Sequence, residues 1–205
     1  MSETVLVIGG GGREHAIVRA LAPDAEVYAL ASNRNPGIAA LAAGTETADA
    51  TDADAVVAYA EEVGADAVVV GPESALAAGV ADALNDAGVF TFGPTAEAAR
   101  IETDKAYQRE FMAENDIPGT PGFETFETAD AAADYVEAVD DDVAVKPAGL
   151  TGGKGVRVTG DQVSHAEAAE YVRGSGHDEW VIEERFVGEE FTVQAFVDDG
   201  EVRPT

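Results

Sequence analysis

Residues 146–158 read KPAGLTGGKGVRV, which places two lysines and four glycines together after a short apolar run. Glycine lets backbone N–H groups approach an anion closely, and ammonium groups neutralise phosphate charge. The spacing excludes the Walker A phosphate loop, because Ala148 stands at its first glycine position and Gly155 at its Ser/Thr position. We therefore interpret the segment as a different kind of phosphate-binding loop, with an ordinary β-hairpin as the alternative.

Positively charged residues are scarce in the chain as a whole. Twelve Lys and Arg residues stand against 40 Asp and Glu residues, which gives a formal net charge of −28. A surface of this sign repels nucleic-acid backbones, so no nucleic-acid partner is expected. The acids are spread along the chain, which favours a solvated, halophile-like folded surface over a cation-binding face. Lysine occurs only at Lys105, Lys146 and Lys154, so each is a candidate for a specific task.

A glycine-rich segment, GGGGREH at 9–15, follows the first apolar run. It does not fit the dinucleotide fingerprint G-x-G-x-x-G, because Glu14 and His15 stand where the third glycine belongs. A strand–glycine–helix junction still presents N–H groups to an anion, and Arg13 adds charge. A phosphate or phosphosugar site is therefore favoured over a tight structural turn, and His15 is expected on a helix face.

Two acidic segments each have two interpretations. Glu73, in GPES at 71–74, either stabilises a helix N-terminus or accepts hydrogen bonds from sugar hydroxyls or an amine. The acids of WVIEERFVGEEFTV, at 180–193, form either a solvated face or a nucleoside site. In the second case, the exposed backbone after an apolar strand holds the adenine edge, and a later carboxylate holds the ribose.

The elements that position these residues follow from hydrophobic periodicity. The first hundred residues alternate short apolar runs, predicted as strands, with amphipathic helical patterns. The strands are expected at 4–8, 26–30, 66–70 and 88–92, and the helices at 13–21, 52–63 and 74–87. This alternation predicts right-handed βαβ units and a parallel sheet covered on both faces. Ligands on such sheets bind beyond the carboxyl ends of the strands, which is where the polar loops fall.

The second half follows a different pattern. One helix is expected to begin at Thr95, and another runs from near Asp104 to a point before Pro118. After a turn-rich connector, the remaining predictions are a helix at 128–139, strands at 143–147, 155–158, 180–186 and 191–197, and an Asp-Gly hairpin turn leading to a strand from Glu201. These elements predict a second region of the α+β class.

Two features of the whole sequence indicate where in the cell the protein is expected. The chain has no cysteine, so no disulfide framework points to secretion. Its first residues lack the basic and apolar segments of a signal peptide, and no apolar run approaches the roughly 20 residues of a membrane helix. We therefore expect a soluble, cytoplasmic protein with no membrane partner.

Six segments, in order, resemble the ATP-grasp superfamily and, within it, the glycinamide ribonucleotide synthetase (phosphoribosylamine–glycine ligase) family. They read VLVIGGGGREHA, NPG, VVVGPESALAAGVAD, FGPTAEAARIETDKAYQREFM, VKPAGLTGGKGV and VIEERFVGEEFTV. The resemblance implies an α/β fold with an N-terminal parallel-sheet (pre-ATP-grasp), substrate-binding domain at 1–100. A partial α+β ATP-grasp domain at 101–205 follows, with a lid subdomain at about 120–187.

The resemblance also implies an ATP site in the second domain. Lys105 and Lys146 would contact the ATP phosphates, and residues 149–155 would fold over them. The adenine edge and the ribose would be held by residues after 182, with Glu190 on the ribose hydroxyls. The full ATP-binding set is Lys105, Lys146, Gly149, Gly152, Gly153, Lys154, Gly155, Glu183, Glu184, Phe186, Val187 and Glu190.

In the first domain, the resemblance implies a phosphosugar site. Gly11, Gly12 and Arg13 would hold its phosphate, and Glu73 its ribose or amine end. The full substrate-binding set is Gly11, Gly12, Arg13, Glu14, Asn35, Pro36, Gly37, Gly71, Pro72 and Glu73.

The implied reaction is the ATP-dependent ligation of glycine to 5-phosphoribosylamine in de novo purine synthesis. It proceeds through glycyl phosphate and gives glycinamide ribonucleotide, ADP and phosphate. The alternatives are another ATP-grasp ligase of the purine pathway and a non-catalytic nucleotide or phosphosugar binder. An Mg²⁺ or Mn²⁺ ion is also implied, with its ligands expected beyond Thr205, so the nucleotide cleft is expected to be half-built in this chain.

Overall fold

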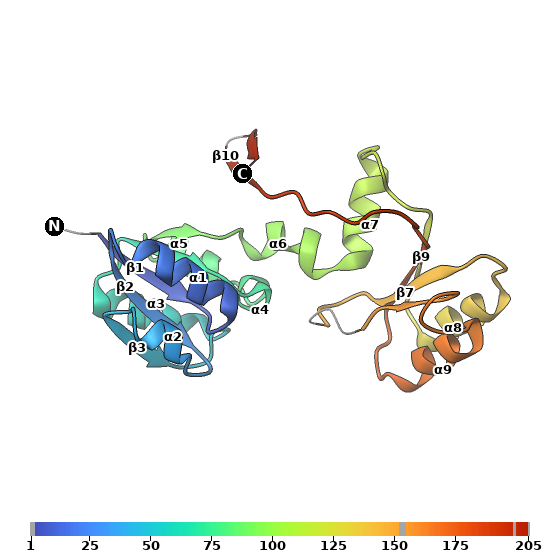
Figure 1. The fold of residues 1–205 in the computed structure, drawn as a ribbon, viewed down its shortest axis with the longest axis horizontal. Helices are drawn as coiled ribbons and strands as arrows, with labels where there is room; N and C mark the ends of the chain where they lie inside the picture. Colours follow the sequence, from blue (N-terminus) through green and yellow to red (C-terminus); the bar gives the residue numbers. More distant parts are fainter. Residues whose placement is uncertain (1–2, 152–154, 199, 205) are drawn as a thin grey trace.

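The computed structural model describes residues 3–151, 155–198 and 200–204. Two lobes are joined through the helices α6 (Ala96–Thr103) and α7 (Lys105–Glu114) (Figure 1). The predicted fold class is confirmed, because a parallel sheet is followed by a smaller antiparallel one. The domain bounds at 1–100 and 101–205 and the lid at about 120–187 remain predictions.

The first lobe is built on one parallel sheet with the strand order β3-β2-β1-β4-β5. Its strands are β1 (Thr4–Ile8), β2 (Glu26–Ala31), β3 (Gly44–Thr47), β4 (Ala67–Val70) and β5 (Phe90–Phe92). Alternate residues of the central strand β1 enter different cores. Leu6 packs with α3, α4 and α5, whereas Val7 packs with α1 and α2. Helices therefore cover both faces, and the carboxyl edge of the sheet stays open for the glycine-rich loop.

The helices of this lobe are α1 (Gly12–Leu21), α2 (Pro36–Ala39), α3 (Ala53–Val63), α4 (Glu73–Ala77) and α5 (Val80–Asp86). Three of them, α1, α3 and α4, begin within one residue of the predicted positions, whereas α2 was not predicted. The single helix predicted at 74–87 was wrong: Gly79, with φ of +79°, separates α4 from α5. The edge strand β3 was not predicted, because its residues GTET are largely exposed and carry no apolar alternation.

The two connecting helices begin where the sequence predicts. The Thr95 hydroxyl accepts a hydrogen bond from the N–H of Ala98, and the Asp104 carboxylate accepts one from the N–H of Tyr107. Each of these side chains caps the free N–H groups at a helix start. The cap at Asp104 fixes Lys105 as the first residue of α7.

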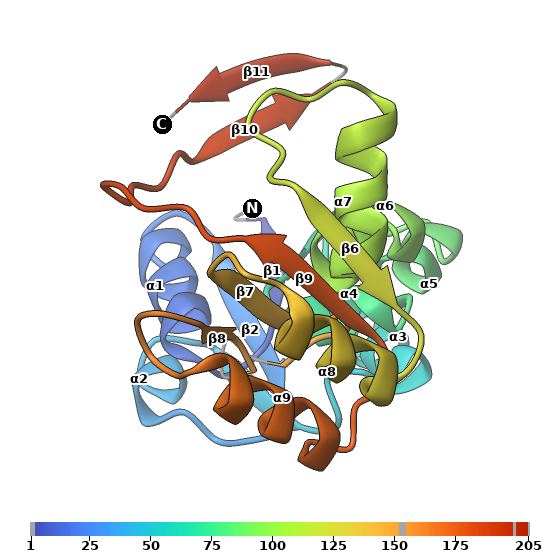
Figure 2. The same ribbon diagram turned by 90° about the vertical axis from the view of Figure 1, so that its right-hand side faces the viewer.

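The second lobe has an antiparallel sheet with the strand order β6-β9-β7-β8. Its elements are β6 (Phe123–Phe126), α8 (Ala129–Ala138), β7 (Val143–Pro147), β8 (Arg157–Val158), α9 (His165–Gly174) and β9 (Trp180–Glu184). The helices α8 and α9 lie together on one face (Figure 2), where they bury Val145, Trp180 and Ile182. The opposite face of this sheet carries the candidate site.

Several predicted strand bounds in this half were wrong. The strand predicted at 155–158 is limited to Arg157–Val158, and the one at 180–186 ends at Glu184. Residues 191–194, predicted as the start of a strand, are outside any strand, and β10 spans only Ala195–Asp198. The predicted hairpin is confirmed, because β10 pairs antiparallel with β11 (Glu201–Pro204). In the described part of the chain, no helix is long and apolar enough to cross a membrane.

Nearly all the described acidic side chains lie near the surface, where salt screens their mutual repulsion. Within residues 3–151, 155–197 and 200–204, whose burial the structure describes, Glu14 and Glu183 are the only buried charged residues. Raising NaCl from 0.1 to 1 M shortens the Debye length from about 10 Å to about 3 Å. We expect the midpoint of thermal unfolding, followed by circular dichroism, to rise with NaCl. An unchanged or falling midpoint would contradict this expectation.

Candidate functional site

The pairing of β7 with β9 brings Lys146 and Glu183 to the same face of the second sheet. Lys146 stands opposite Val181, and Ala144 stands opposite Glu183, so the two charged residues are diagonal neighbours across the strand pair. Their strand neighbours Val145 and Ile182 point the other way, into the core beneath α8 and α9. Strand alternation therefore separates the charged face from the apolar one.

Glu183 is buried, with 4% of its surface exposed, and two cations hold its carboxylate. Lys146 Nζ lies 2.5 Å from Oε2, while Arg109 Nε and Nη2 lie 2.8 Å from Oε1 and 3.2 Å from Oε2. Burial by itself would raise the pKa of Glu183. The hydrogen bonds from Arg109 and Lys146 outweigh it, so the pKa lies below its ordinary value. The group is therefore an anion at neutral pH.

Lys105 begins α7 and ties this helix to the glycine-containing loop after β7. Its backbone N–H donates to the carbonyl of Ala148 at 2.8 Å, and its Nζ donates to the carbonyl of Gly149 at 2.8 Å. The pKa of Lys105 is lowered, first by burial and then by the charge of Lys146. The first turn of a helix also disfavours a cation. Burial and the charge of Lys146 thus outweigh the carboxylates of Glu183 and Asp104, which favour the charged form of Lys105.

The charges of this cluster do not balance. Three cations (Lys105, Arg109 and Lys146) surround one buried carboxylate, so these four groups carry a formal charge of +2 in a chain whose net charge is −28. The nearby carboxylate of Asp104 is engaged in capping α7. A polyanion such as a nucleotide triphosphate would match this excess positive charge, and its binding would offset the repulsion between the two ammonium groups.

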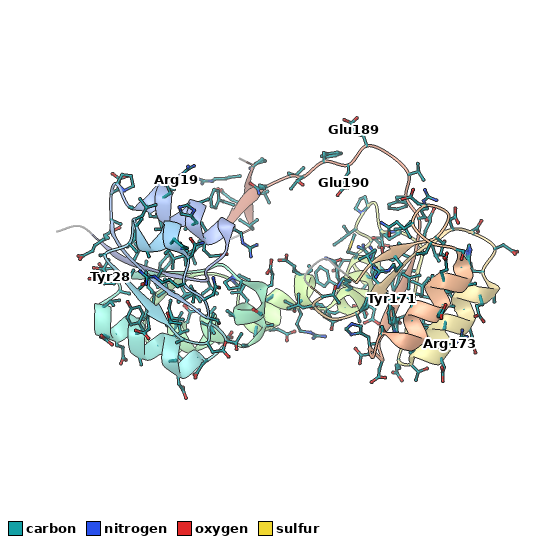
Figure 3. All side chains as sticks on the ribbon, turned by 60° about the horizontal axis from the view of Figure 1, so that its bottom comes forward. Arg19, Tyr28, Tyr171, Arg173, Glu189 and Glu190 are labelled. Carbon is teal, nitrogen blue, oxygen red and sulfur yellow. The ribbon has the colours of Figure 1, made fainter. Side chains whose placement is uncertain are left out.

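The other predicted ATP-binding residues are less closely gathered. Gly152, Gly153 and Lys154 lie outside the described residues, and the carbonyl of Gly155 accepts a hydrogen bond from the Tyr171 hydroxyl. Beyond β9 the chain is extended and exposed: Phe186 is 63% and Val187 84% exposed. Glu190 lies on the long connection out of the second lobe (Figure 3), and Glu184 is exposed at the end of β9. The side chain of Glu183, predicted at the adenine edge, is engaged with Lys146 and Arg109.

In the first lobe, Arg13 lies between two carboxylates at the carboxyl edge of the sheet. Its Nη1 lies 3.1 Å from Glu73 Oε1, and its Nε lies 3.2 Å from Glu14 Oε1. The hydrogen bond with Glu73 is the main cause of the raised pKa of Arg13, and the same bond lowers the pKa of Glu73. Arg13 and Glu73 are therefore charged at neutral pH, and the side chain of Arg13 remains 56% exposed.

Glu14 is buried and supports the glycine-rich loop. Its second oxygen accepts a hydrogen bond from the N–H of Gly11 at 2.7 Å. Gly9, with φ of +116°, packs so closely that a Cβ there would lie 2.7 Å from Glu14 Cγ, and Gly71 packs against the same side chain. These two glycines are thus required by the space that Glu14 occupies. Pro72 follows as the N-cap residue of α4.

Asn35, Pro36 and Gly37 form the start of α2 and hold the same loop from the other side. The Asn35 side chain accepts hydrogen bonds from the N–H groups of Gly37 and Ile38, and its Nδ2 donates to the carbonyl of Gly10 at 3.0 Å. Gly37 packs against the ring of His15 on α1. The three residues therefore shape the loop through their own contacts, and Gly12 begins α1 beside it.

A pocket of about 240 Å³ lies at this edge, and Arg13 and Glu14 are part of its lining. Sequence reasoning missed several further polar lining residues: Ser32, Asn33, Asp49, Thr51 and Ser74. Asp49 and Thr51 follow β3, so recognising that strand would have placed them at the same edge. Arg109 was also missed. The available signal was its position one helical turn after Lys105 in a chain with few cations.

Two family models match the chain. The model described as "Phosphoribosylglycinamide synthetase, N domain" matches residues 3–102, and the model described as "Phosphoribosylglycinamide synthetase, ATP-grasp (A) domain" matches residues 103–205. The phosphoribosylamine–glycine ligase of Methanopyrus kandleri is 50% identical over 98% of this chain and 47% of its own length. That of Methanococcoides burtonii is 51% identical over 95% and 46%. The chain spans about half the length of these curated relatives.

Solved structures agree on the fold. A phosphoribosylamine–glycine ligase from Thermotoga maritima superimposes with a TM-score of 0.73 at 25% identity, covering 97% of this chain and 48% of that one. An N5-carboxyaminoimidazole synthetase from Staphylococcus aureus, complexed with ADP, gives 0.64 at 15% identity over 90% and 48%. The second likeness shows the fold alone.

The depressed pKa of Lys105 is directly measurable, because the chain has only three lysines. We expect one lysine ¹³Cε resonance, assigned through Lys105→Arg, to titrate below the ordinary value of 10.5. Lys146→Met should shift this titration upward, because it removes a neighbouring positive charge. A Lys105 pKa at or above 10.5 in the parent protein would contradict the described arrangement of the two ammonium groups.

Proposed function

The chain belongs to the phosphoribosylglycinamide synthetase family, and from that premise we propose that it contributes to an ATP-dependent ligase that joins glycine to 5-phosphoribosylamine. The products are glycinamide ribonucleotide, ADP and phosphate. The observation that carries the proposal is the approach of Lys105 and Lys146, two of only three lysines, beside one buried carboxylate. Like charges placed together in so acidic a chain are best explained by an anionic ligand.

The nucleotide phosphates would bind to the Lys105 and Lys146 ammonium groups, beside the loop that begins at Gly149. The adenine edge would then lie toward the end of β9, where the backbone of Glu184 and the following residues becomes exposed. Phe186 and Val187 would supply apolar surface, and Glu190 the ribose contact. In this arrangement Glu183 acts through its ion pairs, because its side chain is already engaged.

The first lobe would hold the phosphosugar. Arg13 pairs with Glu14 and Glu73 through Nε and Nη1, and more than half of its side chain faces solvent, so N–H donors remain for a phosphate. Glu73 remains ionised because Arg13 lowers its pKa, which suits it to bind an amine or hydroxyl groups. The adjacent pocket adds the Ser32 and Asn33 side chains as hydrogen-bonding partners. An arginine between two carboxylates therefore matches a ligand with a phosphate and an amine.

The implied Mg²⁺ or Mn²⁺ does not fit the described residues. Within 3–151, 155–198 and 200–204, no three His, Cys, Asp or Glu side chains converge as a metal site.

In the proposed reaction, side chains of this protein neutralise charge on the phosphates and orient the reactants. A glycine carboxylate oxygen attacks the γ-phosphorus of ATP, the bond to the β,γ-bridging oxygen breaks, and ADP leaves. The phosphoribosylamine nitrogen then attacks the acyl carbon of glycyl phosphate, loses a proton, and phosphate leaves. Lys105 and Lys146 would neutralise charge on the phosphates during the first step, which is the main task of a protein in phosphoryl transfer. Arg13 and Glu73 would orient the amine for the second.

Removing one of these ammonium groups tests the nucleotide site. We expect Lys146→Met to weaken ATP binding, measured by isothermal titration calorimetry, by about 10- to 150-fold, because a charge-assisted hydrogen bond contributes roughly 1.5–3 kcal/mol. Arg173→Met is the matched control. It also removes an ion-paired cation, here one held by Asp134 and Glu137 at the outer surface of the second lobe (Figure 3). Unchanged ATP affinity in Lys146→Met would refute the proposed site.

A second measurement tests the reaction itself. ADP release from ATP should require glycine and 5-phosphoribosylamine together, because only the amine consumes the acyl phosphate. Release with another amine-bearing purine precursor, and none with glycine, would favour a different ligase. Tight ATP binding with no release under either condition would instead assign this chain a binding role.

A further inference from the structure

Arg109 is a partly buried cation that the proposed reaction does not use. It lies on α7, and its side chain is 16% exposed. Its guanidinium makes a two-point pair with Glu183, and its Nη1 also contacts the sulfur of Met112 at 3.1 Å. A planar guanidinium bound at two points fixes the orientation of its carboxylate partner, as a single ammonium group does not.

The charge of Arg109 affects how strongly Glu183 attracts Lys146. Glu183 receives hydrogen bonds from Arg109 and Lys146 together, so the three groups carry a formal charge of +1. Without Arg109, the carboxylate and Lys146 would sum to zero, and the full carboxylate charge would act on one ammonium group. Buried opposite charges attract strongly at short range, so that ammonium group would be less available to a second anion.

We propose that Arg109 is a positioning residue that acts through Glu183 to hold Lys146 in place and keep its charge available to nucleotide phosphate. This inference rests on the proposed function. Arg109 itself touches no nucleotide in this scheme. The lysine side chain has four rotatable bonds, and fixing its end before the ligand arrives lowers the entropy lost on binding.

The position of Arg109 on α7 extends this effect to the second ammonium group. Lys105 and Arg109 are one turn apart on α7, so they share one side of the helix. The start of α7 is tied to the loop by the hydrogen bond from Lys105 N–H to the carbonyl of Ala148. One helix therefore places Lys105 directly and Lys146 through the carboxylate of Glu183. The ammonium groups of Lys105 and Lys146 are therefore positioned together before a ligand binds.

The test is a double-mutant cycle on ATP affinity, measured by calorimetry on the 205-residue chain. We expect Arg109→Met to weaken ATP binding on the order of 10-fold, the effect of losing a charge-assisted contact. We expect Arg109→Met combined with Glu183→Gln to bind ATP more tightly than Arg109→Met alone, because the amide no longer competes for Lys146. A merely structural loss would leave the double variant as weak as the single one, or weaker.

Two further variants keep the outcome clear. Arg109→Lys retains the charge and should fall between the parent and Arg109→Met, and it replaces that variant if Arg109→Met fails to fold by circular dichroism. Arg173→Met removes another ion-paired arginine, one that contacts Asp134 and Glu137 at the outer surface, and should leave ATP affinity unchanged. Parent-like affinity in Arg109→Met, or no recovery in the double variant, would overturn the inference. If Lys146→Met also binds normally, the proposed function fails instead.

Discussion

The carboxylate of Glu183 is the group on which the second lobe depends. It is buried on the face of the sheet that α8 and α9 leave uncovered, and an unpaired buried charge there would be strongly unfavourable. Arg109 and Lys146 remove that penalty. They also connect α7 to the β7–β9 strand pair. One ionic cluster thus joins the connecting helix to the sheet and brings together three of the twelve Lys and Arg residues of an acidic chain.

The first lobe, although it has a different fold, also contains a buried acid that pairs with a cation. Glu14 is buried beneath the glycine-rich loop, holds the N–H of Gly11 and pairs with the exposed Arg13. In both lobes a buried acid forms an ion pair with a more exposed cation. Gly9 and Gly71 owe their small size to this acid, since any side chain on them would enter the space that it fills. The glycines shape the site indirectly, by making room for its support.

Local sequence patterns predicted most helices and strands well, but they predicted the contacts between distant side chains poorly. Strands β1 and β7 match their predicted bounds, and the caps at Thr95 and Asp104 mark the two connecting helices, because apolar runs and capping residues act within a few positions. The strands β3 and β6 were missed because both are mostly exposed and carry little apolar signal. The helix α9 was missed despite its capping box, Ser164 with Glu167. The contact between Arg109 and Glu183 joins residues 74 positions apart, so no local pattern reveals it.

The bond from the Lys105 ammonium group to the Gly149 carbonyl has a consequence for how an anion would arrive. An ammonium group has three N–H donors, and in this structure a backbone dipole of the loop occupies one of them. The protein's own peptide group thereby acts as a stand-in for an anion. An incoming phosphate must share this donor set or displace the carbonyl. Where the carbonyl is displaced, occupancy of the cationic cluster and the conformation of the chain at Gly149 are thermodynamically linked, and each reports on the other.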